Sequence, residues 1–176
     1  MTDAALENAI TLLKQGDQSG FDVIYEATKT KVYYAILTIL KDSSLAEDIM
    51  QETYLKAIKY IKKYNRKHSF EAWIITIAKN TAINTYNRRK RELNVDASET
   101  PEIFGETLST SEDQYYLKQL LEILNPIEKE VIIRHVILDE KHKTIAKALN
   151  KPLGTITWTY QNALQKLRKK AGEEDE

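Results

Sequence analysis

The chain has 176 residues, no cysteine and a formal net charge of zero, so it suits one ordinary domain or two small ones. The lack of cysteine excludes disulfides, thiolate metal sites and thiol nucleophiles. No apolar run approaches the roughly 20 residues of a membrane-spanning helix, and the first residues do not have the basic start and apolar core of a signal peptide. We therefore expect a soluble, cytoplasmic protein, and five glycines and three prolines among abundant helix formers predict an all-α fold.

Two helices are predicted between residues 17 and 62. Asp17 or Ser19 is a candidate cap for the first, and Asp42 or Ser43 is one for the second. The apolar side chains of the first recur at helical spacing, at Phe21, Ile24, Tyr25, Val32, Ala35, Ile36 and Ile39. Those of the second are Met50, Tyr54, Ala57, Ile58 and Ile61. The segment YNRKHS, 64–69, then breaks the pattern.

A third helix is predicted from Phe70, with Trp73, Ile74, Ile77 and Ala78 on its apolar face. The side chains of its opposite face change along the helix from amides to guanidiniums. They lie within an arc of about 100° around the helix axis and are Asn80, Asn84, Asn87, Arg88 and Arg91. Amides read base edges and arginines hold phosphates. A plain solvated face is usually a mixture of Glu and Lys, which have better helix propensity than Asn. The stripe therefore favours nucleic-acid contact over a solvated surface.

An acidic joint follows the third helix, because residues 93–112 contain no Lys or Arg and mix Ser, Thr, Asp, Glu, Pro and Gly without periodicity. This predicts a helical module, a flexible linker, a second helical module and an acidic tail, at 1–92, 93–112, 113–172 and 173–176. Residues 51–92 carry eleven basic and three acidic residues, and residues 114–172 carry eleven and five. The two basic blocks indicate either two surfaces for a polyanion or two solvated helical faces.

The second module has the order of a helix-turn-helix. Asn125 is predicted to cap a helix with Pro126 at its first position and Glu128 at the capping-box position. The apolar residues of that helix are Ile127, Val131, Ile132 and His135 or Val136. A short helix over 144–149 and a tight turn, NKPLG at 150–154, come next.

The last predicted helix is GTITWTYQNALQKLRKK, 154–170, with inward residues Ile156, Tyr160, Ala163, Leu164 and Leu167. Trp158 falls on its outward face, beside Asn162, Gln165 and Lys169. In a helix-turn-helix the N-terminal residues of the second helix meet bases in the major groove. The basic end favours this interpretation over a helical hairpin without a role at DNA.

These patterns resemble a known family. SLAEDIMQETYLKAIKYI, 44–61, followed by SFEAWIITIAKNTAINTYNRRKRE, 69–92, resembles conserved region 2 of extracytoplasmic-function sigma factors, the small two-domain subunits that give bacterial RNA polymerase its promoter specificity. Residues 124–169 are similar to their region 4. The specific combination is AED..QET, then F.AW...IAKN, then NP.EKEV with.K.LGT, and with the linker it covers nearly the whole chain.

The resemblance implies two roles for the first module. The AED..QET helix docks in this family on the clamp helices of the largest polymerase subunit, which assigns core binding to Asp48, Gln51, Glu52, Tyr54 and Leu55. A structural alternative is that the acidic residues complement the helix N-terminus. The loop at 64–69 and the next helix correspond to the part that, in this family, captures an unstacked base of the minus-10 element and begins melting. The residues implied there are Arg66, Lys67, His68, Lys79, Asn80, Asn84, Asn87, Arg88 and Arg91.

For the second module the resemblance implies minus-35 recognition and contact with the polymerase flap. The residues implied are Lys143, Lys151, Thr155, Thr157, Trp158, Thr159, Gln161, Asn162 and Gln165. The family commonly has a lysine, a small residue and an arginine where this chain has Thr157, Trp158 and Thr159, so we expect fewer phosphate contacts and a weaker salt dependence. Trp158 either touches a thymine methyl or sugar, or anchors a protein partner.

The predicted function is that of a sigma factor, with polymerase core and promoter DNA as partners and without membrane insertion, a cofactor or a metal. An anti-sigma factor is a further partner that is common in the family, and the acidic linker is either a polyanion mimic or a passive tether. A helix-turn-helix regulator that never joins polymerase is the alternative, but it has no need of the AED..QET helix. An enzyme is disfavoured, because the sequence has no Gly-rich phosphate loop, metal-ligand spacing or nucleophile arrangement.

Overall fold

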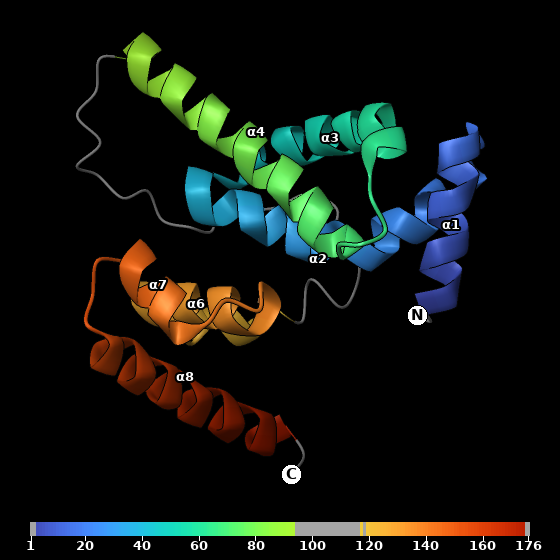
Figure 1. Cartoon of the computed structure of the whole chain (residues 1–176). Helices are drawn as coiled ribbons and strands as arrows, with labels where there is room; N and C mark the ends of the chain where they lie inside the picture. Colours follow the sequence, from blue (N-terminus) through green and yellow to red (C-terminus); the bar gives the residue numbers. More distant parts are fainter. Residues whose placement is uncertain (1–2, 94–116, 118, 175–176) are drawn as a thin grey trace. The chain divides into compact units, whose positions relative to one another are not determined.

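The computed structural model describes residues 3–93, 117 and 119–174, and these form helices and connecting loops without a β-strand (Figure 1). The chain divides into two compact units, Met1–Gly105 and Glu106–Glu176. The predicted all-α class with two helical domains is confirmed. The predicted linker lies outside the described residues from residue 94 onward, and so do the last two residues of the predicted tail. In the described part of the chain no helix is long and apolar enough to cross a membrane.

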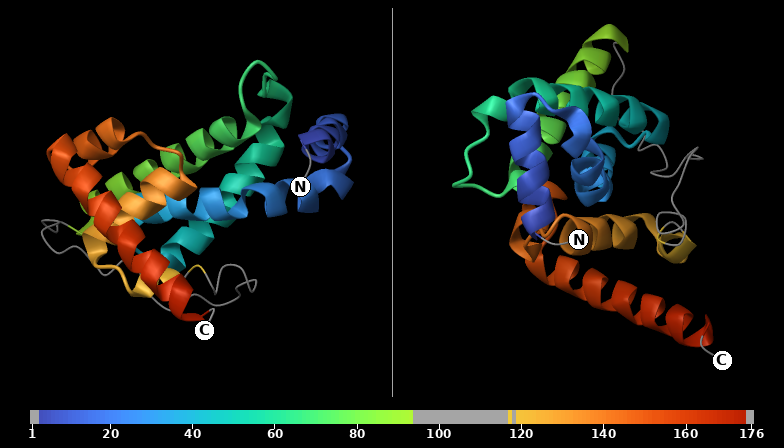
Figure 2. Two further views of the ribbon diagram at one scale, coloured as in Figure 1. Left: turned by 90° about the horizontal axis from the view of Figure 1, so that it is seen from below. Right: turned by 90° about the vertical axis from the view of Figure 1, so that its right-hand side faces the viewer.

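The N-terminal unit begins with a helix that the sequence did not predict, α1 (Asp3–Gln15), which buries Ala9, Ile10 and Leu13. A 3₁₀ turn, η1 (Gln18–Gly20), follows it and is capped by the carboxylate of Asp17. Gly20 lies so close to α1 that an added Cβ would come within 2.6 Å of the carbonyl oxygen of Ala9. The close approach requires glycine there, and it packs α1 against the start of the next helix (Figure 2).

Three long helices complete this unit: α2 (Phe21–Leu40), α3 (Ser43–Tyr60) and α4 (Phe70–Leu93). They pack on one another around the fully buried side chains of Ile24, Ile36, Leu37 and Ile74. Asp42 caps α3 as predicted, through a 3.0 Å hydrogen bond from the backbone N–H of Leu45. The N-cap of α2 is Gly20 rather than a polar side chain. A 3₁₀ turn, η2 (Ile61–Lys63), and the loop at 64–69 join α3 to α4.

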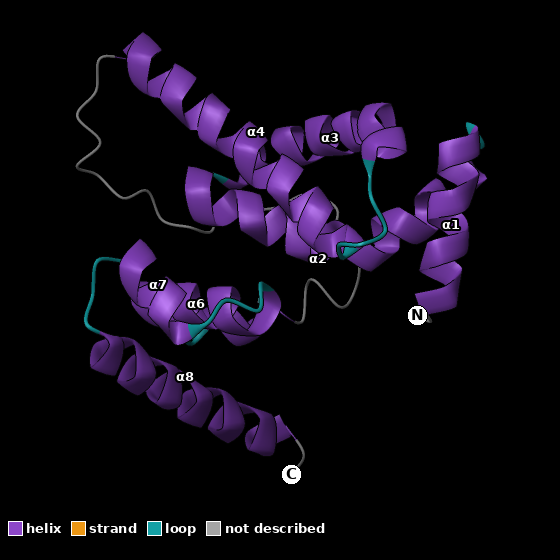
Figure 3. Ribbon diagram, in the orientation of Figure 1, coloured by secondary structure: helices purple, strands orange, loops and turns teal. Residues whose placement is uncertain are grey.

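The C-terminal unit contains α6 (Pro126–Ile132), the π-helical turn η3 (Ile133–Ile137), α7 (His142–Ala148) and α8 (Leu153–Glu174) (Figure 3). The predicted capping box of α6 is confirmed, because Asn125 and Glu128 exchange hydrogen bonds of 3.0 Å. A small core of Val131, Ile145 and Ile156 joins α6, α7 and α8. The predicted short helix at 144–149 begins two residues earlier and ends one earlier.

The π-helical turn corrects one part of the predicted apolar face. A π turn holds one extra residue, which changes the phase of the side chains that follow. His135 is half-buried and contacts the rings of His142 and Tyr160, whereas Val136 is exposed. Val136 therefore does not belong to the buried side of α6.

Candidate nucleic-acid interface

The exposed face of α3 carries four of the five residues expected to bind polymerase core. Asp48, Gln51, Glu52 and Leu55 lie within about 100° on the helix surface, and all four are exposed, Leu55 to 69%. Glu52 forms a 2.7 Å ion pair with Lys56 one turn later. An isolated leucine this exposed, framed by acidic and amide side chains, gives the face an apolar centre with a polar rim, as in protein–protein interfaces.

Tyr54, the fifth of these residues, is 4% exposed, which contradicts its predicted place at the interface. Its hydroxyl lies 2.9 Å from the hydroxyl of Thr28, and its ring packs edge-on against Phe21 at 5.7 Å. Burial raises the pKa of Tyr54 well above its ordinary value. Tyr54 is therefore a core residue that fixes α3 on α2.

The loop at 64–69 presents basic side chains beside the start of α4. Arg66, Lys67 and His68 are all exposed. The loop is closed by a turn in which the N–H of His68 donates to the carbonyl of Asn65 at 3.1 Å. The ring of Tyr64 is buried against Phe70 and Trp73. Trp73, expected in the core, is half-buried in this aromatic group.

The polar stripe of α4 is exposed along its whole length, at Asn80, Asn84, Asn87, Arg88 and Arg91. Within the described residues the side-chain amides of Asn80 and Asn84 have no hydrogen-bond partner. Arg91 donates from Nε to the carbonyl oxygen of Asn87 at 3.2 Å. Lys79, half-buried beside the stripe, interacts within the protein. Amides free of protein partners are available to base edges, which is what direct readout requires.

The C-terminal unit places α7, a four-residue connection and α8 in helix-turn-helix order. On α8 the side chains of Thr155, Trp158, Gln161 and Gln165 are exposed and that of Asn162 is half-buried. Trp158 is 65% exposed, so its predicted outward orientation is confirmed. The apolar positions Ile156 and Ala163 are buried as predicted, while Tyr160, Leu164 and Leu167 are half-buried.

Two threonines of α8 have positions that limit a role at DNA. Thr159 is 4% exposed, which contradicts a direct contact between its side chain and bases. The Thr157 hydroxyl donates to the carbonyl of Leu153 at 3.1 Å and lies 3.4 Å from Nδ1 of His142. Thr157 is therefore directed at the start of α7, and Thr159 packs in the unit.

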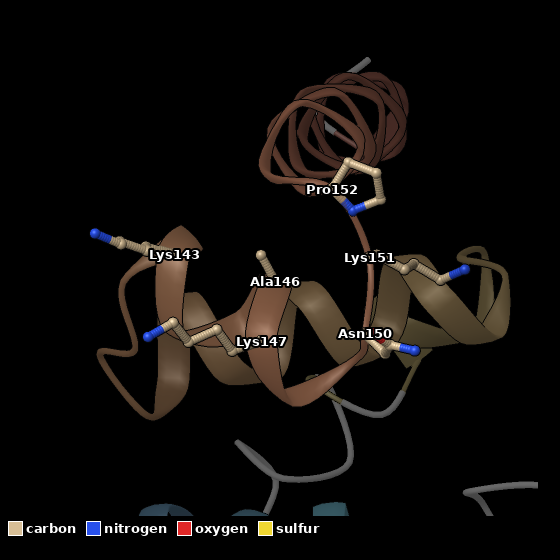
Figure 4. Close-up of a pocket in the computed structure, with 6 residues that line it drawn as sticks. All are labelled: Lys143, Ala146, Lys147, Asn150, Lys151 and Pro152. Carbon is tan, nitrogen blue, oxygen red and sulfur yellow. The ribbon is translucent and has the colours of Figure 1, made fainter.

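An open cavity of about 470 Å³ lies at the connection between α7 and α8. Ala146 and Pro152 form its apolar lining, and its polar residues are Lys143, Lys147, Asn150 and Lys151. Figure 4 shows the side chains of Lys143 and Lys147 extending to one side of the cavity, and those of Asn150 and Lys151 to the other. Lys143 and Lys151 were predicted from the sequence, but Lys147 was not. Lys147 follows Lys143 by four residues, and this spacing places the two on the same helix face. Three ammonium groups around one depression form a favourable site for phosphate oxygens.

A histidine pair connects η3 to the start of α7. The ring centroids of His135 and His142 are 4.4 Å apart, and Tyr160 meets both rings. Nδ1 of His135 lies 2.8 Å from the carbonyl of Glu140, which can only accept, so His135 carries its proton on Nδ1. Nε2 of His142 is buried without a hydrogen-bond partner in the described part of the chain. Desolvation and the neighbouring His135 lower the pKa of His142 below its ordinary value.

No cluster of three or more histidine, cysteine or acidic side chains within the described residues has the geometry to hold a metal ion. The site residues group into three surfaces: the exposed face of α3, the loop at 64–69 with the stripe of α4, and the α7–α8 pair.

Comparison with known proteins identifies the two units. The model of sigma-70 region 2 matches residues 24–92, and that of sigma-70 region 4 matches residues 114–167. The ECF RNA polymerase sigma factor SigW of Bacillus subtilis (strain 168) is 26% identical, over 93% of this chain and 95% of the relative. SigM of the same organism is 28% identical, over 57% and 61%.

A solved structure of the sigma factor RpoE in complex with the anti-sigma factor NepR, from Bartonella quintana, is 21% identical, with a TM-score of 0.47 over 85% of this chain and 94% of that one. The two region models fall on the two compact units in the order of the chain, and together they match more than half of it. The chain therefore belongs to the sigma-70 family, as a sigma factor of the extracytoplasmic-function (ECF) group.

Proposed function

We propose that this ECF sigma factor binds the core of RNA polymerase, directs it to promoters and helps to open the DNA at the minus-10 element. The observation that carries the proposal is the exposed stripe of α4. Its amides, which have no hydrogen-bond partner among the described residues, give way along the helix to arginines, in the same unit as the exposed face of α3. The protein acts in the cytoplasm, where polymerase and promoter meet, and performs no catalysis of its own. An anti-sigma protein is a further partner proposed from family membership alone.

Core binding is assigned to the exposed face of α3, at Asp48, Gln51, Glu52 and Leu55. Leu55 supplies apolar area that is desolvated on docking, and the acidic side chains set orientation and speed association with a basic partner surface. The ion pair of Glu52 with Lys56 is exposed, so it is easily exchanged for an intermolecular pair.

Minus-10 recognition is assigned to the stripe of α4 and the loop at 64–69. Extruding a base costs a few kcal/mol of lost stacking and pairing, which protein contacts must offset. Asn80 and Asn84 supply donors and acceptors for the extruded strand, while Arg88 and Arg91 neutralise phosphates further along the helix.

Minus-35 recognition is assigned to α8, with Thr155, Trp158, Gln161, Asn162 and Gln165 toward the groove. The lysines around the cavity hold the DNA backbone. This arrangement offsets the uncharged residues that α8 carries where relatives commonly have basic ones.

The deciding experiment mixes the purified protein with core polymerase and measures complex formation and promoter-specific transcripts. Asn80→Ala and Asn84→Ala should impair promoter opening while leaving core affinity unchanged, and Gln18→Ala, which removes an exposed amide from η1, should change neither. A protein that binds duplex DNA but forms no complex with core would be a helix-turn-helix regulator instead. Equal loss of opening and core binding, with a lower melting temperature, would make the two asparagines structural.

A further inference from the structure

The loop at 64–69 is held by α1, a helix that comes 50 residues earlier in the chain. Nζ of Lys14 donates to the backbone carbonyl oxygen of Tyr64 at 2.8 Å, and it lies 5.1 Å from the centroid of the Tyr64 ring. One side chain thus contacts both the backbone and the ring of the first loop residue. The contact is partly buried, so it is screened less than a surface pair.

A second contact ties the middle of the loop to the same helix. Nη2 of Arg66 donates to Oγ1 of Thr11 at 2.6 Å, and Nε of Arg66 lies 3.3 Å from a carboxylate oxygen of Glu7. Glu7 and Thr11 are one turn apart on α1, and the Thr11 hydroxyl donates to the carbonyl of Glu7 at 2.8 Å. The guanidinium of Arg66 is therefore engaged by α1 through two of its nitrogens.

The loop also closes on itself. The hydroxyl of Tyr64 donates to the carbonyl of His68 at 2.7 Å, and the N–H of Lys67 donates to Oδ1 of Asn65 at 3.0 Å. Tyr64 is buried, so its ring and hydroxyl fix both ends of the loop. The side chains of Lys67 and His68 are left exposed on a turn that is already formed.

We propose that α1 positions this loop for the promoter strand, and that Arg66 is its tether to α1 while Lys67 and His68 meet the DNA. The proposal rests on the proposed function of the loop in minus-10 recognition. The carboxylate of Glu7 already balances the charge of Arg66, and two nitrogens of that guanidinium contact α1, whereas the side chains of Lys67 and His68 are open to the strand. Ordering the loop before DNA binds removes part of the entropy cost of binding.

The salt dependence of promoter binding separates a tether from a phosphate ligand. For the holoenzyme on a promoter fragment, Lys67→Gln should reduce the slope of log affinity against log salt concentration by about one unit. Arg66→Gln should leave that slope unchanged while slowing promoter opening. Glu7→Gln should slow opening when Arg66 is present and add nothing in the Arg66→Gln background. A slope reduced by Arg66→Gln, with tighter binding in Glu7→Gln, would overturn the proposal.

Hydrogen exchange in the free protein tests the positioning without DNA. The N–H groups of Lys67 and His68 are both hydrogen-bonded within the loop. Lys14→Met removes the donor but keeps the chain length, and it should speed exchange of these amides; Lys14→Arg should restore slow exchange. The control Lys29→Met removes a lysine of α2 that pairs with Glu26, and it should leave the loop unchanged.

The possible failures are distinguishable. Unchanged loop exchange in both Lys14→Met and Arg66→Gln, with melting temperatures like that of the wild type, would overturn the positioning by α1 and leave the loop's assignment to the promoter strand intact. If a protein with both Lys67→Gln and His68→Gln opened promoters as the wild type does, the assignment of the loop to the strand would fail, and this proposal with it.

Discussion

Glu128 connects the start of α6 to the middle of α8, and its replacement by alanine tests how the C-terminal unit is held together. Its carboxylate accepts the backbone N–H of Asn125 at 3.0 Å and Nζ of Lys166 at 2.8 and 2.9 Å. The residue is buried, although it carries a charge. The side chain is therefore a helix cap and a cross-link at once, and Glu128→Ala removes both functions.

The expected loss in the free energy of unfolding of this unit is about 2–3 kcal/mol. A hydrogen bond to a charged group contributes about 1.5–3 kcal/mol, and an exposed ion pair about 0.2–1 kcal/mol. The low end applies to the ion pair, because the side chain of Lys166 is 46% exposed and solvent screens it. Glu128→Gln keeps an oxygen for the Asn125 N–H and should cost about 1 kcal/mol.

Native-state hydrogen exchange of the α6 and α8 amides measures these opening free energies in the full chain. Glu52→Ala is the control, because it removes one partner of an exposed ion pair on α3. It should lower the opening free energy of the α3 amides by about 0.3–0.5 kcal/mol. A loss in Glu128→Ala no greater than in this control would refute the capping and cross-linking argument. Equal losses in Glu128→Gln and Glu128→Ala would show that charge, not the cap, carries the stability.

Three further predictions concern other parts of the chain. Gly20→Ala places a Cβ 2.6 Å from the carbonyl oxygen of Ala9, so backbone must move and the N-terminal unit should lose about 1–3 kcal/mol; an unchanged melting temperature would contradict this. Trp158→Ala should weaken binding to duplex promoter fragments about tenfold with core affinity unchanged, and the reverse result would make Trp158 a protein anchor. The pKa of His142 lies below its ordinary 6.5, so the unfolded chain takes up the proton first and stability of the C-terminal unit should fall as pH drops through about 6.5 and below. The opening free energies of the α8 amides at pH 7.5 and 5.5 measure this loss of stability. His142→Gln should reduce the loss, and an equal loss in that variant would assign it to another group.

Local pattern was sufficient wherever a feature depends on neighbours within one helix. The capping box at Asn125 and Glu128, the cap at Asp42 and the outward position of Trp158 all follow from spacings of three to four residues. Such contacts form within a helical turn, so the sequence already contains both partners at a fixed distance.

The two residues placed wrongly at interfaces show how a family motif can conflict with periodicity. Tyr54 recurs with Met50 and Ala57 on the buried side of α3, while Leu55, one residue later, is exposed. One step along a helix turns the side chain by about 100°, so Tyr54 lies on the buried side while Leu55 lies on the exposed side. Thr159 is likewise at the edge of the buried face of α8. Periodicity was the better guide to orientation in both cases.

What could not be predicted depends on contacts between distant residues. The apolar spacing of α1 was present in the sequence, but its two partners, Gly20 and the loop at 64–69, are identified only by the fold. Helical periodicity could not predict the π-helical turn that exposes Val136 either, because it assumes 3.6 residues per turn throughout the helix.

In the C-terminal unit the positive charge nearest to the start of α8 lies beside that helix rather than on it. After the Gly-Thr-aliphatic step α8 has no charged side chain until Lys166. The basic residues nearest to that start border the cavity, at Lys143, Lys147 and Lys151. Since each phosphate neutralised by a lysine adds about one unit to the salt slope, removing these three lysines should reduce the slope of this unit by about three units. Substitutions at Trp158 or Gln161 should change affinity without changing the slope. Attraction to DNA and reading of its sequence are thereby assigned to different elements of the same helix-turn-helix.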